Sequence, residues 1–448
     1  MSNHWKIYQP STSLPWSIDR VRHLHRRAGL GFTREETERG LAAGPEISID
    51  CLLSGSSRSQ FLRDDFEEMS QVLAEAATRS DDEVRLKAWW IFRLLWTPDP
   101  LQERLTLMWH NHFATSNAKV GNLQLMLRQN QIFRQFARDK FQRLLQAVLL
   151  DPAMLIWLDS NSNRQGHPNE NLARELMELF TLGVGNYTEQ DVKQAARALT
   201  GWSVKDSQAR FRSEQFDSAD KTVLNVTQAF DSTALADHLV SQPATAQRLA
   251  WRLCDTFMGE GVVSQTAISE LAEVIAASQL DIGRAVEIIL RSELFFSEAN
   301  IASRIISPIE FVTGYLRTLE LLDRPPSTMA LARWCSQLGQ DLFRPPNVGG
   351  WAGGRNWLNA RTIVGRANFA AALVAGELHT PIEAPDFKRF CARLANSKLV
   401  SAKPASVSRL LGQHLLSVGL TAEQEALWSD QPSELIGQLL SQPQACLC

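Results

Sequence analysis

Apolar side chains recur every three or four residues along almost the whole chain, and this spacing constrains the fold more than any other feature. In the segment 83–96, Val84, Ala88, Ile91 and Leu95 fall on one face, as in a buried helix. The same spacing predicts further helices over 101–113, 123–136, 139–150, 172–182, 189–200, 234–240, 244–258, 266–277, 282–291, 308–321 and 329–338. Strand-like alternation is almost absent, so the sequence predicts an all-α protein, a large irregular multi-helical globular domain.

The chain is long enough for one large or two fused helical domains. Its 448 residues exceed the roughly 250 to 300 at which a single core stops growing. We expect an irregular N-terminal arm over 1–17 and a helical domain over 18–380. An irregular linker at 381–387 then leads to a C-terminal helical segment over 388–448, packed on that domain. The polar stretch 203–231 lacks helical period and predicts a loop with a minor short hairpin.

Composition excludes several classes of protein. The formal net charge is -3, so we expect no bulk attraction to nucleic acid or anionic lipid. The six cysteines form no Cys-x-x-Cys pair, which argues against structural zinc and favours reduced thiols. Neither a signal-peptide pattern nor a run of 18 apolar residues occurs. We therefore predict no membrane span and, by default, a cytoplasmic location.

The densest group of charged residues lies in the predicted helix that follows Pro168. Glu170, Arg174 and Glu178 are spaced i, i+4 and i+8, which places them along one face of a straight α-helix, with Glu175 about a quarter turn away. Three carboxylates and an arginine on one helix are compatible with three roles: metal ligands, a general acid and base, or an ion-pair lattice without catalytic function. The pattern leaves all three interpretations open, and we take these four residues as candidate catalytic residues.

A second candidate site lies at His110 and His112. Residues two apart point roughly opposite ways in a continuous α-helix, so both histidines bind one ion only if the helix ends or loosens near Trp109. We predict a divalent metal, zinc, iron or manganese, held by His110, His112 and Glu175. The alternative is that His112 is a hydrogen-bonded core residue while His110 caps the helix or faces water.

Two further segments contribute candidate binding residues. Asp159 and Asn161 belong to a polar turn of alternating Asp and Asn, but a calcium loop would need glycine where Arg164 stands, so Asx-turn chemistry is favoured. The glycine-rich run 347–357 has no preceding strand and does not fit a dinucleotide-binding loop. Either its tryptophans pack against helices or the run stacks on a sugar or peptide. The candidate binding residues of this run are Trp351, Arg355 and Asn356. Asn111, which lies between the two histidines, is a further candidate binding residue.

Several blocks of the chain resemble domain-of-unknown-function family 1800. The resemblance extends over about residues 21 to 372. Its most recognisable blocks are His-Arg-Arg-Ala-Gly-Leu-Gly at 25–31, Leu-Met-Trp-His-Asn-His-Phe-Ala-Thr-Ser at 107–116 and Pro-Asn-Glu-Asn-Leu-Ala-Arg-Glu-Leu-Met-Glu-Leu-Phe-Thr-Leu-Gly at 168–183. Shorter blocks follow at 187–192 and 198–202, and the last is Pro-Pro-Asn-Val-Gly-Gly-Trp at 345–351. The resemblance implies a bacterial, uncharacterised protein, because the family has no agreed activity. It also implies a secreted sulfatase-like partner, so that export with a partner remains open.

One departure from the family pattern bears on function. Many relatives have a His-Asp pair before a Gly-x-Lys-Thr segment, where this chain reads Asp217-Ser218-Ala219-Asp220-Lys221-Thr222. If that histidine is functional in the relatives, the function is altered here.

Two functional hypotheses follow. The first is a metal-dependent helical enzyme, a hydrolase or oxidoreductase, in which a bound water is activated at the histidine and glutamate site while Arg174 orients an anionic group. The second is a non-catalytic binding or assembly factor working with the sulfatase-like partner. In that case the charged residues form an ion-pair network, and the run 347–357 or the stretch 203–231 forms the contact surface.

Overall fold

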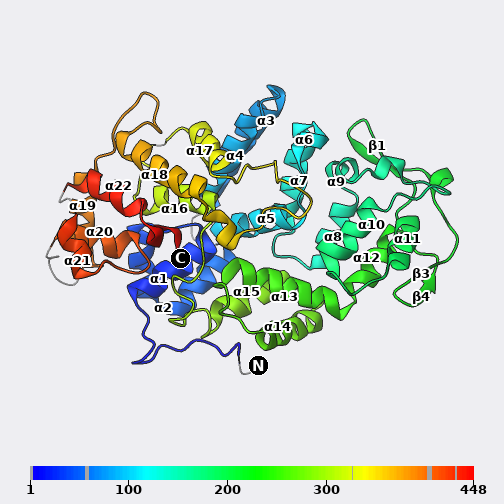
Figure 1. The fold of residues 1–448 in the computed structure, drawn as a ribbon, viewed down its shortest axis with the longest axis horizontal. Helices are drawn as coiled ribbons and strands as arrows, with labels where there is room; N and C mark the ends of the chain where they lie inside the picture. Colours follow the sequence, from blue (N-terminus) through cyan, green and yellow to red (C-terminus); the bar gives the residue numbers. More distant parts are fainter. Residues whose placement is uncertain (1–3, 56–59, 325, 401–405, 429–430) are drawn as a thin grey trace.

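The computed structural model describes the chain except residues 1–3, 56–59, 325, 401–405 and 429–430, and helices dominate it (Figure 1). The first part of the chain forms α1 (Ile18–Gly29), α2 (Arg34–Ser54), α3 (Gln60–Arg79), α4 (Glu83–Trp96), α5 (Pro100–His112), α6 (Asn117–Val120), α7 (Leu123–Gln135), α8 (Phe141–Leu149) and α9 (Pro152–Trp157). The middle part forms the 3-10 turn η1 (Ser160–Ser162), α10 (Asn171–Glu175), the π-helix η2 (Leu176–Thr181), α11 (Glu189–Ala198), the 3-10 turn η3 (Ser213–Gln215), α12 (Ser232–Val240), α13 (Pro243–Phe257), α14 (Gln265–Ala277) and α15 (Ile282–Arg291). The last part forms α16 (Pro308–Thr318), α17 (Thr328–Gln337), the 3-10 turn η4 (Gly354–Trp357), α18 (Ala360–Ala375), α19 (Phe387–Ala395), α20 (Val407–Leu415), α21 (Ala422–Leu427), α22 (Pro432–Leu440) and the 3-10 turn η5 (Pro443–Cys446).

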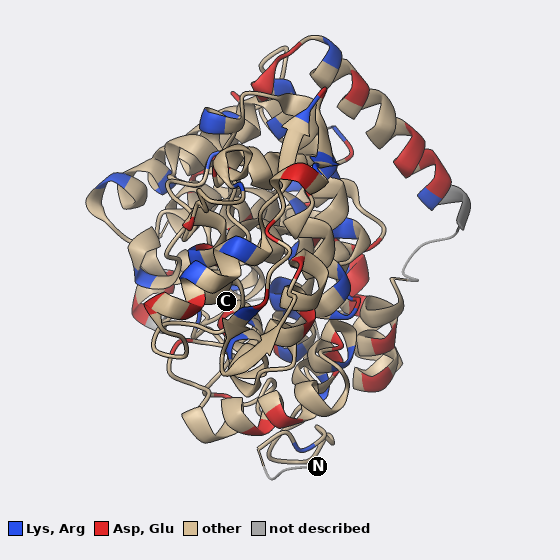
Figure 2. Ribbon diagram, turned by 90° about the vertical axis from the view of Figure 1, so that its right-hand side faces the viewer, with Lys and Arg blue, Asp and Glu red and all other residues tan. Residues whose placement is uncertain are grey.

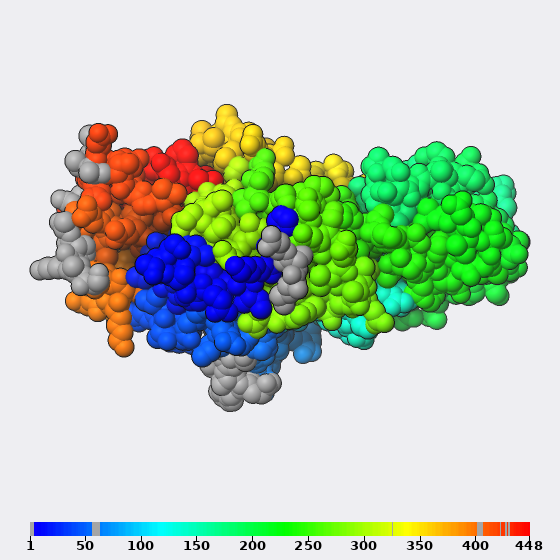
Figure 3. Space-filling model, turned by 90° about the horizontal axis from the view of Figure 1, so that it is seen from below, coloured from blue at the N-terminus to red at the C-terminus, as the bar shows by residue number. Residues whose placement is uncertain are grey.

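The predicted all-α class is confirmed. The strands among the described residues form two small antiparallel hairpins within the stretch predicted to be a loop. The first pairs β1 (Trp202–Lys205) with β2 (Gln208–Phe211), and the second pairs β3 (Lys221–Val223) with β4 (Val226–Gln228). The sequence predicted one short hairpin there and the structure contains two. Together with α8 to α12 they form a lobe that projects from the rest of the molecule, at the right of Figure 1 and of Figure 3.

Local sequence signals account for the ends of many helices. Thr33 and Glu36 form the capping box predicted for the start of α2, in which each side chain accepts a hydrogen bond from the other residue's backbone N–H. Asp99 caps α5 by accepting from the backbone N–H of Gln102, and Pro100 occupies the first helical turn. These caps fix where α2 and α5 begin.

Two hydrophobic cores hold the helices together. The first contains the fully buried Trp109 and runs from Trp5 in the N-terminal arm to Phe296. The second contains the fully buried Trp90 and joins α4 to α16, α17 and α18 and to the C-terminal helices α19, α20 and α22. Helix α5 contributes to both cores, with Trp109 in the first and Leu107 in the second. Residues at the end of α5 therefore lie where the two cores meet.

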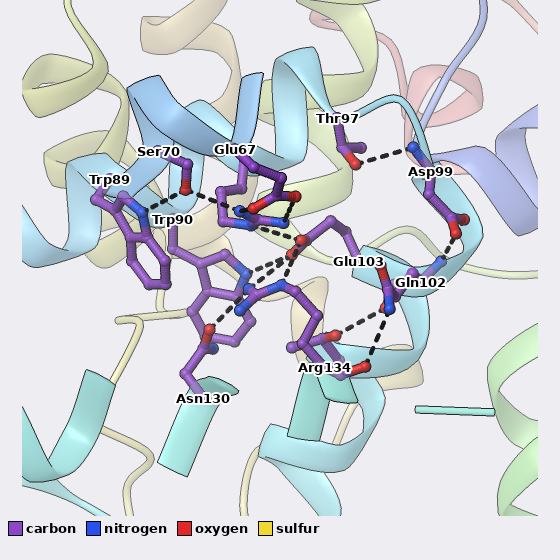
Figure 4. Close-up of polar contacts among 12 residues, drawn as sticks. Glu67, Ser70, Trp89, Trp90, Thr97, Asp99, Gln102, Glu103, Asn130 and Arg134 are labelled. Atoms are coloured by element: carbon purple, nitrogen blue, oxygen red, sulfur yellow. Dashed lines mark hydrogen bonds and ion pairs between the residues drawn. The ribbon is translucent and has the colours of Figure 1, made fainter. Parts of the chain in front are cut away.

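A buried carboxylate ties α4, α5 and α7 together (Figure 4). Glu103 is 1% exposed and accepts hydrogen bonds from Arg93 Nε at 2.7 Å, Arg134 Nε at 2.6 Å and Trp90 Nε1 at 3.1 Å. Arg93 in turn donates to Glu67 of α3. Burial alone would raise the pKa of Glu103, but the two arginines lower it to about 2. We call these five residues the Glu103 cluster; within it, each cation faces a carboxylate.

Charge is dispersed over the surface. Acidic and basic positions are mixed along the elements on the side turned toward the viewer in Figure 2. Within the described ranges, no helix is both long enough and apolar enough to cross a bilayer.

Candidate functional site

Helix α5 continues through both candidate histidines and ends at His112, so it does not meet the condition for both to bind one ion, a helix that ends or loosens near Trp109. His110 Nε2 accepts a hydrogen bond from the backbone N–H of Phe343 at 3.2 Å. His112 Nε2 donates to the carbonyl oxygen of Phe180 at 3.0 Å. Both rings are buried, and burial lowers the pKa of His110 to about 3 and that of His112 well below its usual value. Both imidazoles are therefore neutral and bonded to backbone, the core arrangement that we considered for His112.

The glutamate segment also departs from the predicted geometry. The α-helix gives way at Leu176 to the π-helix η2, whose wider turn rotates the following side chains away from the α-helical row. Arg174 pairs with Glu170 at 3.2 Å and with Glu189 of α11 at 2.7 Å. Glu178 instead accepts a hydrogen bond at 2.7 Å from the hydroxyl of Tyr187. The three residues therefore do not form one continuous row: Glu170 and Arg174 belong to one set of contacts, and Glu178 belongs to another.

Glu175 differs from its neighbours in this segment. It is half-buried, and its carboxylate forms no hydrogen bond with any residue in the described part of the chain. Burial raises the pKa of this carboxyl, and the nearby Glu178 raises it further. A carboxyl group in this state retains its proton to higher pH than an exposed one.

The structure does not assemble the predicted metal site of His110, His112 and Glu175. Over the described ranges, no group of three or more His, Cys, Asp or Glu side chains is placed to hold a metal ion. The physical reason is that α5 stays helical, which points the two imidazoles apart, and each Nε2 already has a backbone partner. The residues present therefore do not fit the predicted ion.

Asp159 and Asn161 act within the lobe. Asp159 Oδ2 pairs with Lys119 Nζ at 2.8 Å and accepts from Asn171 Nδ2 at 3.1 Å. Asn161 Oδ1 accepts from the backbone N–H of Val204 in β1 at 2.6 Å. Both side chains thus connect the polar turn to neighbouring elements.

The segment where the family's His-Asp pair is missing is held by internal contacts. Asp217 pairs with Arg197 of α11 at 2.7 Å. Lys221 is 1% exposed, and its Nζ donates to the carbonyl oxygens of Asp217 and Ala219. These contacts fold the segment against α11.

The other four predicted binding residues come together. Asn111, Trp351, Arg355 and Asn356 line one pocket of about 600 Å³, although Asn111 lies 240 or more residues before the other three in the chain. Helix α5, helix α13 and the segment 351–357 form its walls, and the connection from α17 to α18 passes beside α5 (Figure 1). We call this cavity the Trp351 pocket.

Asn111 positions the tryptophan segment. Its Oδ1 accepts from the backbone N–H of Trp351 at 2.7 Å, and its Nδ2 donates to the carbonyl oxygen of Trp351 at 3.2 Å. Gly350 has φ +75°, and a Cβ at this position would collide with Asn111. The end of α5 therefore fixes where the segment 351–357 crosses the pocket.

Helix α13 also contributes to this pocket, although none of its residues was among the predicted site residues. Trp251 and Arg252 line it, and Arg248 lies one turn earlier on the same helix. Both guanidinium groups stack on the Trp251 ring, at 4.9 and 5.1 Å from its centroid. The available signal was a pair of arginines four residues apart with no acidic residue between them to balance their charge.

Charged residues line the interior and the rim of the pocket. Arg104 and Arg304 both form ion pairs with the buried Glu310. Burial alone would raise the pKa of Glu310, but these two arginines hold it far below its usual range. At the exposed rim, Arg355 pairs with Glu260 at 3.2 Å.

Comparison with known proteins gives one match. The family described as protein of unknown function (DUF1800) matches residues 23–445, so the match continues into the C-terminal helical segment. No curated protein and no solved structure matches the chain.

Proposed function

The chain belongs to the family DUF1800, and on that premise we propose that it is a non-catalytic binding protein that takes a small organic ligand, or one end of a larger one, in the Trp351 pocket. The observation that supports this most is the pocket itself. Its volume of about 600 Å³ falls within the roughly 300 to 1,000 Å³ of small-molecule sites. Its walls combine three tryptophan rings, which offer apolar contact, with charged and amide side chains, which can orient a ligand.

The chemical state of the lining residues favours binding over catalysis. Burial raises the pKa of the Cys254 thiol to about 12, so the thiolate needed for nucleophilic attack is scarce at neutral pH. The Ser307 hydroxyl accepts from the backbone N–H of Glu310 in a capping box, and Glu310 is held by two arginines. The residues that line the pocket include no histidine to serve as a general base.

Tryptophan fluorescence tests the proposal, because Trp251, Trp351 and Trp357 all line the pocket. Ligands from a metabolite and fragment collection should shift the emission and raise the melting temperature of the wild-type protein. The Trp251→Ala variant should lose most of the fluorescence response. Trp202→Ala, which removes a tryptophan from the lobe, should keep it. If no compound changes either signal, or if both variants respond like wild type, the binding proposal is wrong.

A second candidate is acid–base catalysis at Glu175, supported by its raised carboxyl pKa and free carboxylate oxygens. Under this proposal Glu175→Gln abolishes any hydrolytic activity found in substrate screens, whereas Glu170→Gln, which affects the ion pair with Arg174, reduces it less. Activity unchanged in Glu175→Gln would rule it out. Metal analysis of the wild type and of His110→Ala tests the predicted ion separately.

The partner and the cellular location remain predictions. A sulfatase-like secreted partner is expected from the family resemblance alone, and a cytoplasmic location from the sequence pattern alone. Affinity purification of the protein together with whatever it binds in the cell, and fractionation of those cells, are the measurements that check them.

A further inference from the structure

Arg252 of α13 is a nearly buried cation without a hydrogen-bond acceptor. Its side chain is 12% exposed, and its guanidinium forms no hydrogen bond with any residue in the described ranges. The Nε atom is buried and unpaired. Its one ion pair is to Asp255 at 3.8 Å, beyond hydrogen-bond distance, and the Asp255 side chain is 56% exposed. Solvent and added salt weaken such a long and exposed pairing.

The pocket as a whole has more positive than negative groups. Four arginines line it, Arg104, Arg252, Arg304 and Arg355, against three carboxylates, Asp255, Glu260 and Glu310. In the interior, Arg104 and Arg304 share the single carboxylate of Glu310. Arg104 also donates to the carbonyl oxygen of Thr256 at 2.9 Å. Thr256 lies on α13 one turn after Arg252, so the guanidinium of Arg104 contacts the same helix.

The Trp251 ring holds the Arg252 guanidinium in place. The ring centroid lies 5.1 Å from Arg252 Cζ, and Trp251 is 39% exposed. Stacking orients the planar group while leaving its N–H groups unused. Burial lowers the pKa of Arg252 to about 10, so the group remains charged at neutral pH although few polar atoms surround it. A buried cation with unused donors is stabilised by an anion that accepts from it.

We propose that the ligand of the Trp351 pocket carries an oxyanion that binds the guanidinium of Arg252, joined to a ring or apolar body that contacts the tryptophans. Carboxylate, phosphate and sulfate groups each present two oxygens to the two outer nitrogens of an arginine. The net positive charge of Arg104 and Arg304 around Glu310 adds to the attraction. This inference rests on the proposed binding function and specifies the ligand class.

Calorimetric titration with defined probes tests it. The probes are inorganic phosphate, inorganic sulfate, benzoate, phenyl phosphate and, as a neutral analogue, benzyl alcohol, each at millimolar concentration. Phenyl phosphate or benzoate should bind more tightly than the free inorganic anion and more tightly than benzyl alcohol. Binding should weaken as sodium chloride is added, because the contact is between charges.

Two variants on the same helix distinguish a direct contact of Arg252 with the anion from the general effect of removing a positive charge. Arg252→Gln should weaken binding of the anionic probes by about tenfold to a hundredfold, the usual effect of losing a charged hydrogen bond. Arg248→Gln removes the same charge and a stack on the same ring, but Arg248 does not line the pocket, so binding should change less than about threefold.

The outcomes distinguish the ligand class from the binding function. If benzyl alcohol binds as tightly as the anionic probes and Arg252→Gln leaves all affinities unchanged, the anion inference is overturned while the pocket remains a ligand site. If the two variants lose affinity equally, Arg252 is not the specific contact and the inference is overturned as well. If none of the probes binds and no compound changes the tryptophan fluorescence, both the inference and the binding function are wrong.

Discussion

The Glu103 cluster and Arg252 of the Trp351 pocket differ in whether the chain supplies an acceptor for a buried arginine. In the Glu103 cluster, Arg93 and Arg134 donate to one carboxylate that is itself 1% exposed, and Arg93 has Glu67 as well. In the Trp351 pocket, Arg104 and Arg304 pair with Glu310, whereas Arg252, whose side chain is 12% exposed, has no hydrogen-bond acceptor among the described residues. The Glu103 cluster is complete within the chain, whereas Arg252 is paired by an external anion under our proposal.

The difference separates arginines that hold the fold from arginines that are available to a ligand. Removing one member of a satisfied buried ion pair leaves an unpaired charge in the interior and is strongly destabilising. Removing a cation that has no acceptor takes away a desolvation cost instead. Stability and binding should therefore respond oppositely to mutations in the two groups.

The largest effect is expected for Glu103→Gln, which has nearly the same shape but removes the negative charge between Arg93 and Arg134. Unfolding in urea should show a loss of about 3–5 kcal/mol. The control is Glu67→Gln, whose carboxylate also pairs with Arg93 but is 58% exposed; its cost should stay within about 1 kcal/mol. Equal and small losses for both variants would contradict the structural role of the cluster.

The second prediction concerns pH. Because the pKa of Glu103 is lowered to about 2 in the folded protein, below its value in the unfolded chain, its ion pairs contribute fully above about pH 4.5. That contribution, of about 3 kcal/mol, is lost as the pH falls from there toward 2. Urea unfolding at pH 7, 4 and 3 should therefore show a steeper decline for wild type than for Glu103→Gln. Parallel declines would mean that other carboxylates dominate.

An intermediate effect is expected for Asn111→Ala, which removes both hydrogen bonds to the backbone of Trp351. The loss should be about 1–3 kcal/mol, because a buried backbone N–H loses its acceptor. Probe binding should weaken as well, since the segment 351–357 is no longer fixed. Asn356→Ala is the control for stability alone, since Asn356 lines the pocket but its Nδ2 bonds only within that segment, to the carbonyl oxygen of Gly353. Unchanged melting temperature and binding in Asn111→Ala would contradict the positioning role.

The smallest change in stability is expected for Arg252→Gln. Its free energy of unfolding should stay within about 0.5 kcal/mol of wild type, because no hydrogen bond to the protein is lost. Chemical unfolding without ligand measures this directly. A loss above about 2 kcal/mol would place Arg252 with the structural arginines and remove the contrast between the two regions.

The positions of the helices could be predicted from the sequence because the spacing of apolar residues is a local property. The prediction of 83–96 matches α4 at both ends, since the apolar stripe stops where Pro98 and Pro100 prevent further helix. The π-helix η2 could not be predicted from the sequence. Its residues fit the spacing of an ordinary α-helix, and the wider turn is stabilised by tertiary packing and by the bond from Thr181 Oγ1 to the carbonyl oxygen of Leu176.

The candidate site was predicted only in part, for a related reason. Residue types drew attention to the tryptophan segment, for which packing against helices and ligand binding were both left open. The pocket, however, depends on the contact of Asn111 with Trp351, which lie 240 residues apart. Whether a buried arginine finds an acceptor depends on every element packed around it, so the unpaired state of Arg252 has no local sequence signature.

A crystal structure of the protein soaked with phenyl phosphate tests the central claim most directly. The account predicts electron density for the phosphate within hydrogen-bond distance of the outer nitrogens of Arg252, and for the phenyl ring against the tryptophans of the Trp351 pocket. An empty pocket in crystals whose solvent channels reach it, or phosphate bound to the Glu103 cluster instead, would contradict the account.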